Sequence, residues 1–334
     1  MGQLKSFLDK YDLIVFDMDG VMTSEQGYWD AAALTVYELL NSNKYFGSRP
    51  LHLESVFKNR HMIRKHIFLN DKAIVLLKNK GINLNWDLAY VMFCANVTAQ
   101  SKNPDDVYAV LEKISDNILN DYEKIAVNAA IALGKPSEYC MREGELWNKI
   151  AEVFQKWYFG TDNHMGVMDL EEPMFELKTF TAFLNTLSKN KRIAYGTGRN
   201  GIEITTPFSK WNILDKFDKE HNVSYDYVIK AEKTLKSHGI TATLTKPNPY
   251  IFLQAALGID YDVLKIYNGD YDKNIIKKTL IVGDAGSDIL AAQAAGFDFC
   301  AVLTGANKEK SRPYFEKMNA TYIFNSVLDF VDND

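Results

Sequence analysis

The sequence predicts an α/β fold, in which a doubly wound, mostly parallel, Rossmann-like sheet is interrupted by an inserted all-α domain. After residue 170, short apolar runs alternate with amphipathic helical segments, a pattern typical of parallel sheets. Between residues 25 and 169, nearly every segment has helical periodicity. A chain of 334 residues is also long enough for two domains. We therefore expect residues 1–24 and 170–334 to form the α/β core and residues 25–169 to form a helical domain.

The first strand of the core is expected at Leu13–Phe16, because four continuous apolar residues indicate a strand buried on both faces. The glycine at position 20 then ends the extended run. The remaining strands are expected at Arg192–Tyr195, Asp226–Ile229, Thr279–Val282, Phe297–Leu303 and Tyr322–Phe324. Helices are expected at Phe175–Leu187, Tyr250–Leu257 and Asp288–Ala295, the last ending at Gly296.

Helices of the inserted domain are predicted from apolar residues that recur at helical spacing. Pro104 suits the first turn of a helix, with Asn103 before it as the cap. Gly81 and Gly134 suit helix ends. The expected helices are Ala31–Leu40, His52–Phe68, Lys72–Lys80, Leu84–Ala95, Pro104–Leu133 and Glu143–Phe159.

Composition and charge argue against some classes of binding partner, such as nucleic acid. Hydrophobic residues make up 47% and charged residues 24%, and the net charge of −5 shows no basic excess that would favour nucleic acid. No run approaches the roughly 18 apolar residues of a membrane span. Cys94, Cys140 and Cys300 lack metal-ligand spacing, which favours reduced thiols in a cytoplasmic protein. Residues 1–6 fit the loose N-myristoylation template at Gly2, but a chance match or a glycine left by cloning is the favoured explanation.

Polar residues gather where the predicted strands end. Ligands bind open parallel sheets at the carboxyl ends of their strands, so these residues are the candidate site. They are Asp17 and Asp19 after the first strand, Thr197 and Gly198 after the second, Asp284 and Asp288 after Val282, and Lys246 in a loop ahead of a helix.

Asp17 and Asp19 stand two residues apart, in Asp-Met-Asp-Gly. One carboxylate could attack phosphorus and form an aspartyl phosphate. The other could protonate the leaving oxygen and then activate water. Alternatively, this segment is a solvated turn.

Asp284 and Asp288 add two more acids at a strand end. Such carboxylates would repel those near Asp17 unless a cation lay among them, and this predicts a Mg²⁺ ion. Asp284 could also serve as a helix N-cap.

Phosphoryl transfer also needs positive charge and hydrogen-bond donors around the phosphate oxygens. Lys246 supplies a point charge. Thr197 supplies a hydroxyl and a backbone N–H at an expected helix start, and Gly198 permits close approach of the backbone. Taken alone, Lys246 would more often be a solvated surface lysine.

Together, these residues resemble the four motifs of haloacid-dehalogenase-like (HAD) hydrolases, in the right order. The resemblance covers about residues 13–24 and 173–324, and includes Lys246-Pro247-Asn248 and Gly283-Asp284 with Asp288. It implies that Asp17 is the nucleophile, that Asp19 is the general acid and base, and that Thr197 and Lys246 hold the phosphate. It also implies that Asp17, Asp284 and the Asp19 backbone carbonyl bind Mg²⁺, with Asp288 binding the metal region or orienting Lys246.

The helical insertion is similar in position to the first-type cap of this superfamily, although it is longer. Such a cap implies a domain that closes over the site and contacts substrate. The possible substrate residues are Glu25 and Trp29, next to the first motif, and Arg199, as a second phosphate contact. A tryptophan at position 29 is more often a hinge or core residue. The basic stretch around Arg60 and Arg64 is more simply interpreted as a solvated helix face.

The resemblance favours a Mg²⁺-dependent phosphomonoester hydrolase acting on a small phosphorylated metabolite. An intact Asp19 favours phosphate chemistry over dehalogenation. Two alternatives stay open: a phosphomutase of the same superfamily, similar to β-phosphoglucomutase, and a catalytically inactive binding protein on this fold.

Overall fold

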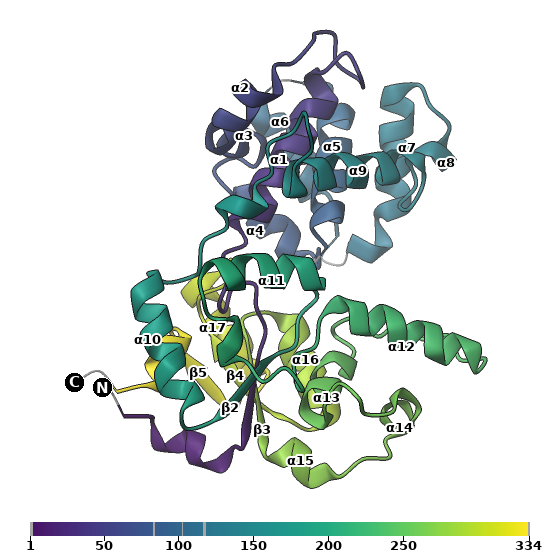
Figure 1. The fold of residues 1–334 in the computed structure, drawn as a ribbon. Helices are drawn as coiled ribbons and strands as arrows, with labels where there is room; N and C mark the ends of the chain where they lie inside the picture. The colour runs from purple at the N-terminus through teal and green to yellow at the C-terminus, as the bar shows by residue number, and fades with distance from the viewer. Residues whose placement is uncertain (1–2, 83, 102, 116–117, 333–334) are drawn as a thin grey trace. The chain divides into compact units, whose positions relative to one another are not determined.

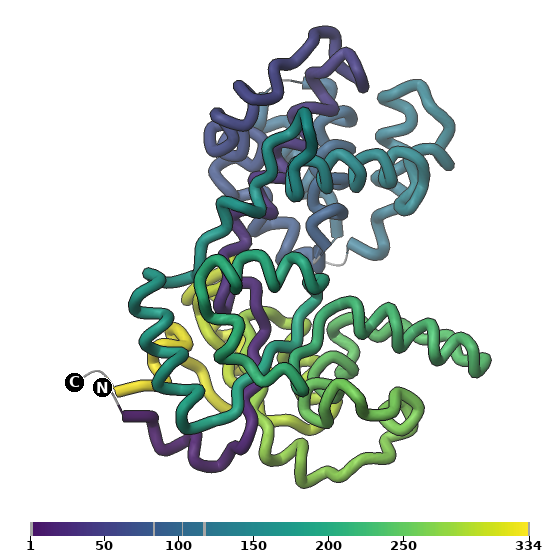
Figure 2. Tube along the Cα trace, viewed as in Figure 1, coloured from purple at the N-terminus to yellow at the C-terminus, as the bar shows by residue number. Residues whose placement is uncertain are grey.

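The computed structural model describes residues 3–82, 84–101, 103–115 and 118–332, so the predicted lipidation site at Gly2 lies outside the described residues. The chain divides into two compact units, which are described separately below. The first is formed by Met1–Ser24 together with Glu172–Asp334, and the second by Glu25–Glu171. Figure 2 shows how the beginning of the chain (purple) joins its last part (green to yellow) in the first unit.

The first unit is built on a parallel sheet of five strands in the order β2-β1-β3-β4-β5, so the predicted α/β class is confirmed. β1 lies between β2 and β3, and Phe16 is in register with Tyr195 on one side and Val282 on the other. The strands are β1 (Leu13–Phe16), β2 (Arg192–Tyr195), β3 (Thr279–Gly283), β4 (Asp298–Val302) and β5 (Tyr322–Phe324).

Helices cover both faces of this sheet, as Figure 1 shows for α10 on one side and α12 and α13 on the other. Along β1, Leu13 and Val15 pack in the core beneath α12, α13 and α16, whereas Ile14 and Phe16 pack beneath α10 and α11. The larger helices are α10 (Leu177–Ser188), α11 (Gly201–Lys210), α12 (Tyr225–Ser237), α13 (Tyr250–Leu257) and α16 (Gly286–Ala295). Burial on both faces explains why the strands are continuously apolar.

Shorter elements complete the first unit. Within the segment 260–277, to which the sequence gave no function, α14 and α15 bury Ile266 and Ile276 in the core. These short elements are η1 (Ser6–Lys10), η4 (Leu214–Lys216), α14 (Val263–Asn268), α15 (Lys273–Lys277), η5 (Lys308–Ser311), α17 (Arg312–Lys317) and η6 (Val327–Phe330).

The strand expected at Asp226–Ile229 is wrong, because these residues begin α12. The aromatic and β-branched residues there suggested a strand, but the buried positions are Val228, Ala231 and Leu235, which recur at helical spacing. The extended residue next to β2 is instead Val223, which forms a bridge with Gly196.

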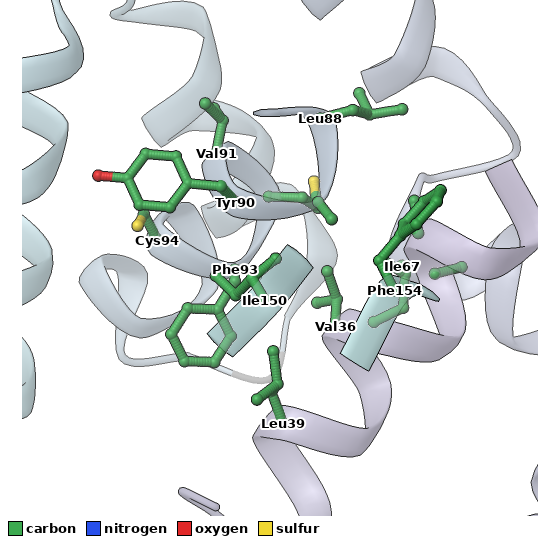
Figure 3. Packing of buried hydrophobic residues seen from close by; sticks show 14 of the residues in the cluster. Val36, Leu39, Ile67, Leu88, Tyr90, Val91, Phe93, Cys94, Ile150 and Phe154 are labelled. Carbon is green, nitrogen blue, oxygen red and sulfur yellow. The ribbon is translucent and has the colours of Figure 1, made fainter. Parts of the chain in front are cut away.

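Among the described residues of the second unit, the regular elements are helices, and the unit has its own apolar core, shown in Figure 3. Val36, Leu88, Phe93 and Ile150 meet in this core from α1, α5 and α9. The elements are α1 (Gln26–Asn41), α2 (Leu53–Lys58), α3 (Arg60–Ile67), α4 (Lys72–Asn79), α5 (Asn85–Ala99), α6 (Pro104–Glu112), η2 (Ile118–Asn120), α7 (Tyr122–Leu133), α8 (Ser137–Cys140), α9 (Glu145–Phe159) and η3 (Met168–Leu170).

Two predicted helices of this unit are each divided. The expected helix His52–Phe68 breaks at Asn59, whose side chain donates to the Ser55 carbonyl at 2.9 Å. The expected helix Pro104–Leu133 ends at Glu112, and α7 starts afresh at Tyr122. The predicted start of α6 is confirmed, since the Asn103 side chain accepts from the Asp105 N–H at 3.2 Å.

Within the described part of the chain, no helix combines the length and apolarity required to cross a membrane. The three cysteines, Cys94, Cys140 and Cys300, are buried and unpaired. Burial raises the pKa of the Cys94 and Cys300 thiols, which disfavours the reactive thiolate.

Candidate active site

Three carboxylates meet at the carboxyl edge of the sheet. Asp17 follows β1, Asp284 follows β3, and Asp288 lies in the first turn of α16. One oxygen from each lies within 4.8 Å of the others, the spacing of ligands around one ion. Oxygen ligands of this kind suit a hard divalent cation.

Lys246 places its ammonium group between two of these acids. Its Nζ lies 2.8 Å from Asp17 Oδ1 and 2.8 Å from Asp288 Oδ1, and only 7% of its side chain is exposed. The solvated-surface interpretation of Lys246 is therefore wrong. Burial alone would lower the pKa of Lys246, but the Asp17 and Asp288 carboxylates outweigh burial and raise it.

Burial raises the pKa of Asp17 to about 7, from an ordinary value of 3.8. Lys246 opposes this increase, whereas the nearby Asp288 and Asp19 carboxylates add to it. A second cation beside Asp17 would favour the ionised form that a nucleophile requires. The charge balance of the site thus fits a bound metal ion.

The raised pKa of Asp17 predicts a pH-dependent stability in metal-free protein. Between about pH 4 and 7, the folded protein holds a proton on Asp17 that the unfolded chain has lost, so the free energy of unfolding falls as the pH rises. Asp17→Asn removes this contribution. With a chelator present, we expect the variant to exceed the wild type in unfolding free energy at pH 8, and this advantage to disappear near pH 4. Denaturant titrations at both pH values measure the difference, and a constant difference would contradict the prediction.

The Asp284 side chain fits into its position because two neighbouring residues, Gly20 and Gly305, have no side chain. A Cβ atom at Gly20 or Gly305 would overlap Asp284 Oδ2. Thr304, just before Gly305, donates from its hydroxyl to the Gly20 carbonyl and joins the two loops. Thr304 and Gly305 were not among the residues predicted for the site, although their position after β4, at the same edge of the sheet, could have revealed them.

If Asp284 binds Mg²⁺, Gly305→Ala is expected to weaken Mg²⁺ binding by about 10-fold or more, because the added methyl group would displace the Asp284 carboxylate. Gly305 does not have a left-handed backbone, so the substitution tests space and not strain. Calorimetric titration with Mg²⁺ measures the affinity. Gly27→Ala is the control, since a Cβ there would meet nothing within 4 Å. Equal Mg²⁺ affinities in the Gly305 variant and the wild type would show that Gly305 does not affect metal binding through Asp284.

Thr197 lies at the same edge, but its backbone differs from expectation. Its N–H donates to the Val223 carbonyl at 3.0 Å, and α11 starts only at Gly201, with Asn200 as its cap. The predicted use of the Thr197 N–H at a helix start is therefore wrong. The Thr197 hydroxyl accepts from the Arg199 N–H at 3.2 Å, and Gly198 between them is exposed.

The Asp19 carboxylate binds the Arg199 guanidinium. The guanidinium contacts both oxygens, with Nη2 at 2.5 Å from Oδ1 and Nε at 3.1 Å from Oδ2. The hydroxyl of Thr23 donates to Oδ1 at 3.2 Å. In this arrangement Arg199 binds Asp19, whereas the sequence predicted a phosphate contact.

Asp284 is not the N-cap residue of α16, because the residue directly before that helix is Ala285. The Asp288 carboxylate instead accepts from the Ala285 N–H at 3.2 Å through Oδ2, while its Oδ1 binds Lys246. Asp288 can thus orient Lys246 and also lie in the acidic group.

The other two predicted substrate residues lie in the helical unit. Glu25, before α1, pairs with Lys78. Trp29 lies beneath the Arg64 guanidinium, 5.4 Å from the ring centre, and its Nε1 has no hydrogen-bond partner among the described residues. Arg64 itself pairs with Asp71 at 2.8 Å and is 12% exposed, so the solvated-face interpretation is wrong for this residue.

Comparisons with known proteins agree with this geometry. Residues 243–330 match the model of the HAD-hydrolase-like family. A search of curated proteins gives no match. A crystal structure from the Northeast Structural Genomics Consortium is 25% identical, with a TM-score of 0.80 over 95% of this chain and 97% of that one.

More distant solved structures include a proposed phosphoglycolate phosphatase from Lactobacillus delbrueckii subsp. bulgaricus, at 18% identity and a TM-score of 0.48 over 96% of each chain. Phosphatase Tt82 from Thermococcus thioreducens is 15% identical, with a TM-score of 0.46 over 86% of this chain and 91% of that one.

The first unit thus combines a parallel α/β sheet with an aspartate after β1 and further acids after β3. The family match covers the segment that contains Lys246, Asp284 and Asp288. Residues 243–330 thus match the HAD-like hydrolase family, the family that the sequence motifs resemble.

Proposed function

We propose that this protein is a Mg²⁺-dependent phosphomonoester hydrolase that acts on a small phosphorylated metabolite through a phosphoryl-Asp17 intermediate. The observation that supports this most strongly is the grouping of the Asp17, Asp284 and Asp288 carboxylates with the Lys246 ammonium among them. A nucleophile, ligands for a hard cation and a fixed positive charge are the components that phosphoryl transfer requires.

In the first step, an Asp17 carboxylate oxygen attacks phosphorus and the bond from phosphorus to the leaving oxygen breaks. Asp19 gives its proton to that oxygen. In the second step, Asp19 takes a proton from water, the water oxygen attacks phosphorus, and the bond to Asp17 breaks to release phosphate. The phosphoryl-Asp17 intermediate divides one difficult displacement into two easier ones.

Asp17, Asp284, the Asp19 backbone carbonyl and Asp288 would hold the Mg²⁺ ion. When bound, Mg²⁺ would neutralise charge on the phosphate and suppress the repulsion among the carboxylates. Lys246 would bind a phosphate oxygen from its place between Asp17 and Asp288. The Thr197 hydroxyl and the exposed backbone at Gly198 would supply further donors.

We propose further that the helical unit is the cap of this enzyme. It is inserted between Ser24 and Glu172, whose backbones are joined by a hydrogen bond of 3.3 Å, and it follows Asp19 by only a few residues. Residues of such an insertion would determine which substrate is accepted and would exclude water during the first step.

The test is phosphate release from p-nitrophenyl phosphate and from a panel of phosphorylated metabolites, with Mg²⁺ and with a chelator. We expect release in Mg²⁺ and its loss on chelation. If no compound released phosphate, the proposed hydrolase activity would be contradicted. A phosphomutase that needs a bisphosphate activator, or a binding protein, would then be tested next.

A further inference from the structure

Arg199 holds the Asp19 carboxylate in a planar, two-point contact. Its Nη2 lies 2.5 Å from Oδ1, and its Nε lies 3.2 Å from Oδ1 and 3.1 Å from Oδ2. The Arg199 side chain is 2% exposed and that of Asp19 is 29% exposed. The buried partner is therefore the guanidinium, and the more accessible partner is the carboxylate.

Arg199 is itself fixed on three sides. Its Nη1 donates to the Glu203 carbonyl at 3.1 Å, in the first turn of α11. Its backbone N–H donates to the Thr197 hydroxyl at 3.2 Å, and its carbonyl accepts from the Tyr225 N–H at 2.8 Å. All three guanidinium nitrogens thus have partners, and two of them hold Asp19. This geometry suits positioning of a carboxylate better than capture of a phosphate.

We propose that Arg199 is a positioning residue that acts through Asp19, and that it fixes the orientation from which Asp19 protonates the leaving oxygen. This inference rests on the proposed function, in which Asp19 is the general acid. A carboxylate on a short side chain can rotate freely, and a proton transfer is efficient only when donor and acceptor are held in place. The rigid fork of arginine matches a carboxylate at two points, which a lysine does not.

This role predicts that the loss depends on the leaving group. A nitrophenolate leaves without a proton, whereas an alkoxide needs one. The value of kcat/KM includes the step in which the leaving group departs. For Arg199→Gln we expect kcat/KM to fall about 100-fold or more with an alkyl phosphate such as glycerol phosphate, and less than about 10-fold with p-nitrophenyl phosphate. With both substrates, KM should change little relative to kcat.

A double-mutant cycle distinguishes action through Asp19 from a general effect. If Arg199 acts through Asp19, Arg199→Gln combined with Asp19→Asn should lose no more activity than Asp19→Asn alone. Arg199→Lys is a second variant, for use if Arg199→Gln does not fold. Its loss of kcat/KM should depend on the leaving group in the same way but should be smaller. Arg142→Gln is the matched control: Arg142 holds Asp87 at two points in the helical unit, and its loss should leave the ratio of the two substrates unchanged.

An equal loss of kcat/KM with both substrates and a raised KM would overturn the inference and make Arg199 a phosphate ligand. Additive losses in the double variant, or wild-type activity in Arg199→Gln, would also overturn it. In these cases the wild type still releases phosphate, so the proposed function stands. A wild type without any phosphate release would instead overturn both.

Discussion

Replacing Asp17 with asparagine is expected to reduce phosphate release by at least about 10⁴-fold, because loss of a catalytic nucleophile removes the covalent route entirely. Asparagine has nearly the same size and keeps a ligand oxygen, but its amide does not attack phosphorus. Asp17 directly follows β1, which lies between β2 and β3 in the sheet. The rate is measured with p-nitrophenyl phosphate at saturating Mg²⁺.

The control for Asp17→Asn is Asp87→Asn in the helical unit. Asp87 is 5% exposed and accepts from Arg142 and from Trp147 Nε1 at 2.7 Å, so it is also a buried aspartate with a cationic partner. Its replacement is expected to lower the free energy of unfolding while kcat stays near the wild-type value. An Asp17→Asn protein that retained more than one tenth of the wild-type rate would show that Asp17 is not the nucleophile.

Replacing Lys246 with methionine is expected to lower both activity and stability. Lys246 is buried between two carboxylates, and removing one partner of a buried ion pair costs about 3 kcal/mol or more in free energy of unfolding. Loss of a fixed positive charge at the phosphate should reduce kcat by about 100-fold or more. Mg²⁺ should restore part of the stability, because it supplies positive charge to the same carboxylates. Denaturant titrations with and without Mg²⁺, together with phosphate release, measure both effects.

Lys80→Met is the matched control for Lys246. Lys80 is also buried, at 6% exposure, but its Nζ binds the backbone carbonyls of Glu112 and Ile114 in the helical unit. Its loss should reduce stability without a comparable loss of kcat. If Lys246→Met matched the wild type in both rate and stability, Lys246 would have no role in holding phosphate.

The α/β class and most site positions could be predicted from local patterns in the sequence. Strands such as Leu13–Phe16 are apolar on both faces, and the rule that ligands bind at the carboxyl edge singled out the residues after them. The structure brings the Asp17, Asp284 and Asp288 carboxylates together, with Lys246 between Asp17 and Asp288, as that rule anticipated.

The features that could not be predicted depend on contacts between distant parts of the chain. The pairing of Asp19 with Arg199 spans 180 positions, and the space that Gly305 leaves for Asp284 has no local signature. The wrong prediction of a strand at Asp226–Ile229 arose because the local signal was misleading. Its residues favour a strand locally, but the burial of Val228 and Ala231 favours the helix once the chain is folded.

The measurement that tests the central claim most directly is chemical trapping of the phosphorylated residue. Wild-type protein is mixed with substrate and Mg²⁺, quenched in acid within one turnover and treated with borohydride, which reduces an acyl phosphate on aspartate to homoserine. Peptide mass spectrometry then locates the change. We expect homoserine at position 17, and only when both substrate and Mg²⁺ are present. Unchanged Asp17 under conditions of active turnover, or a modified residue elsewhere, would contradict it.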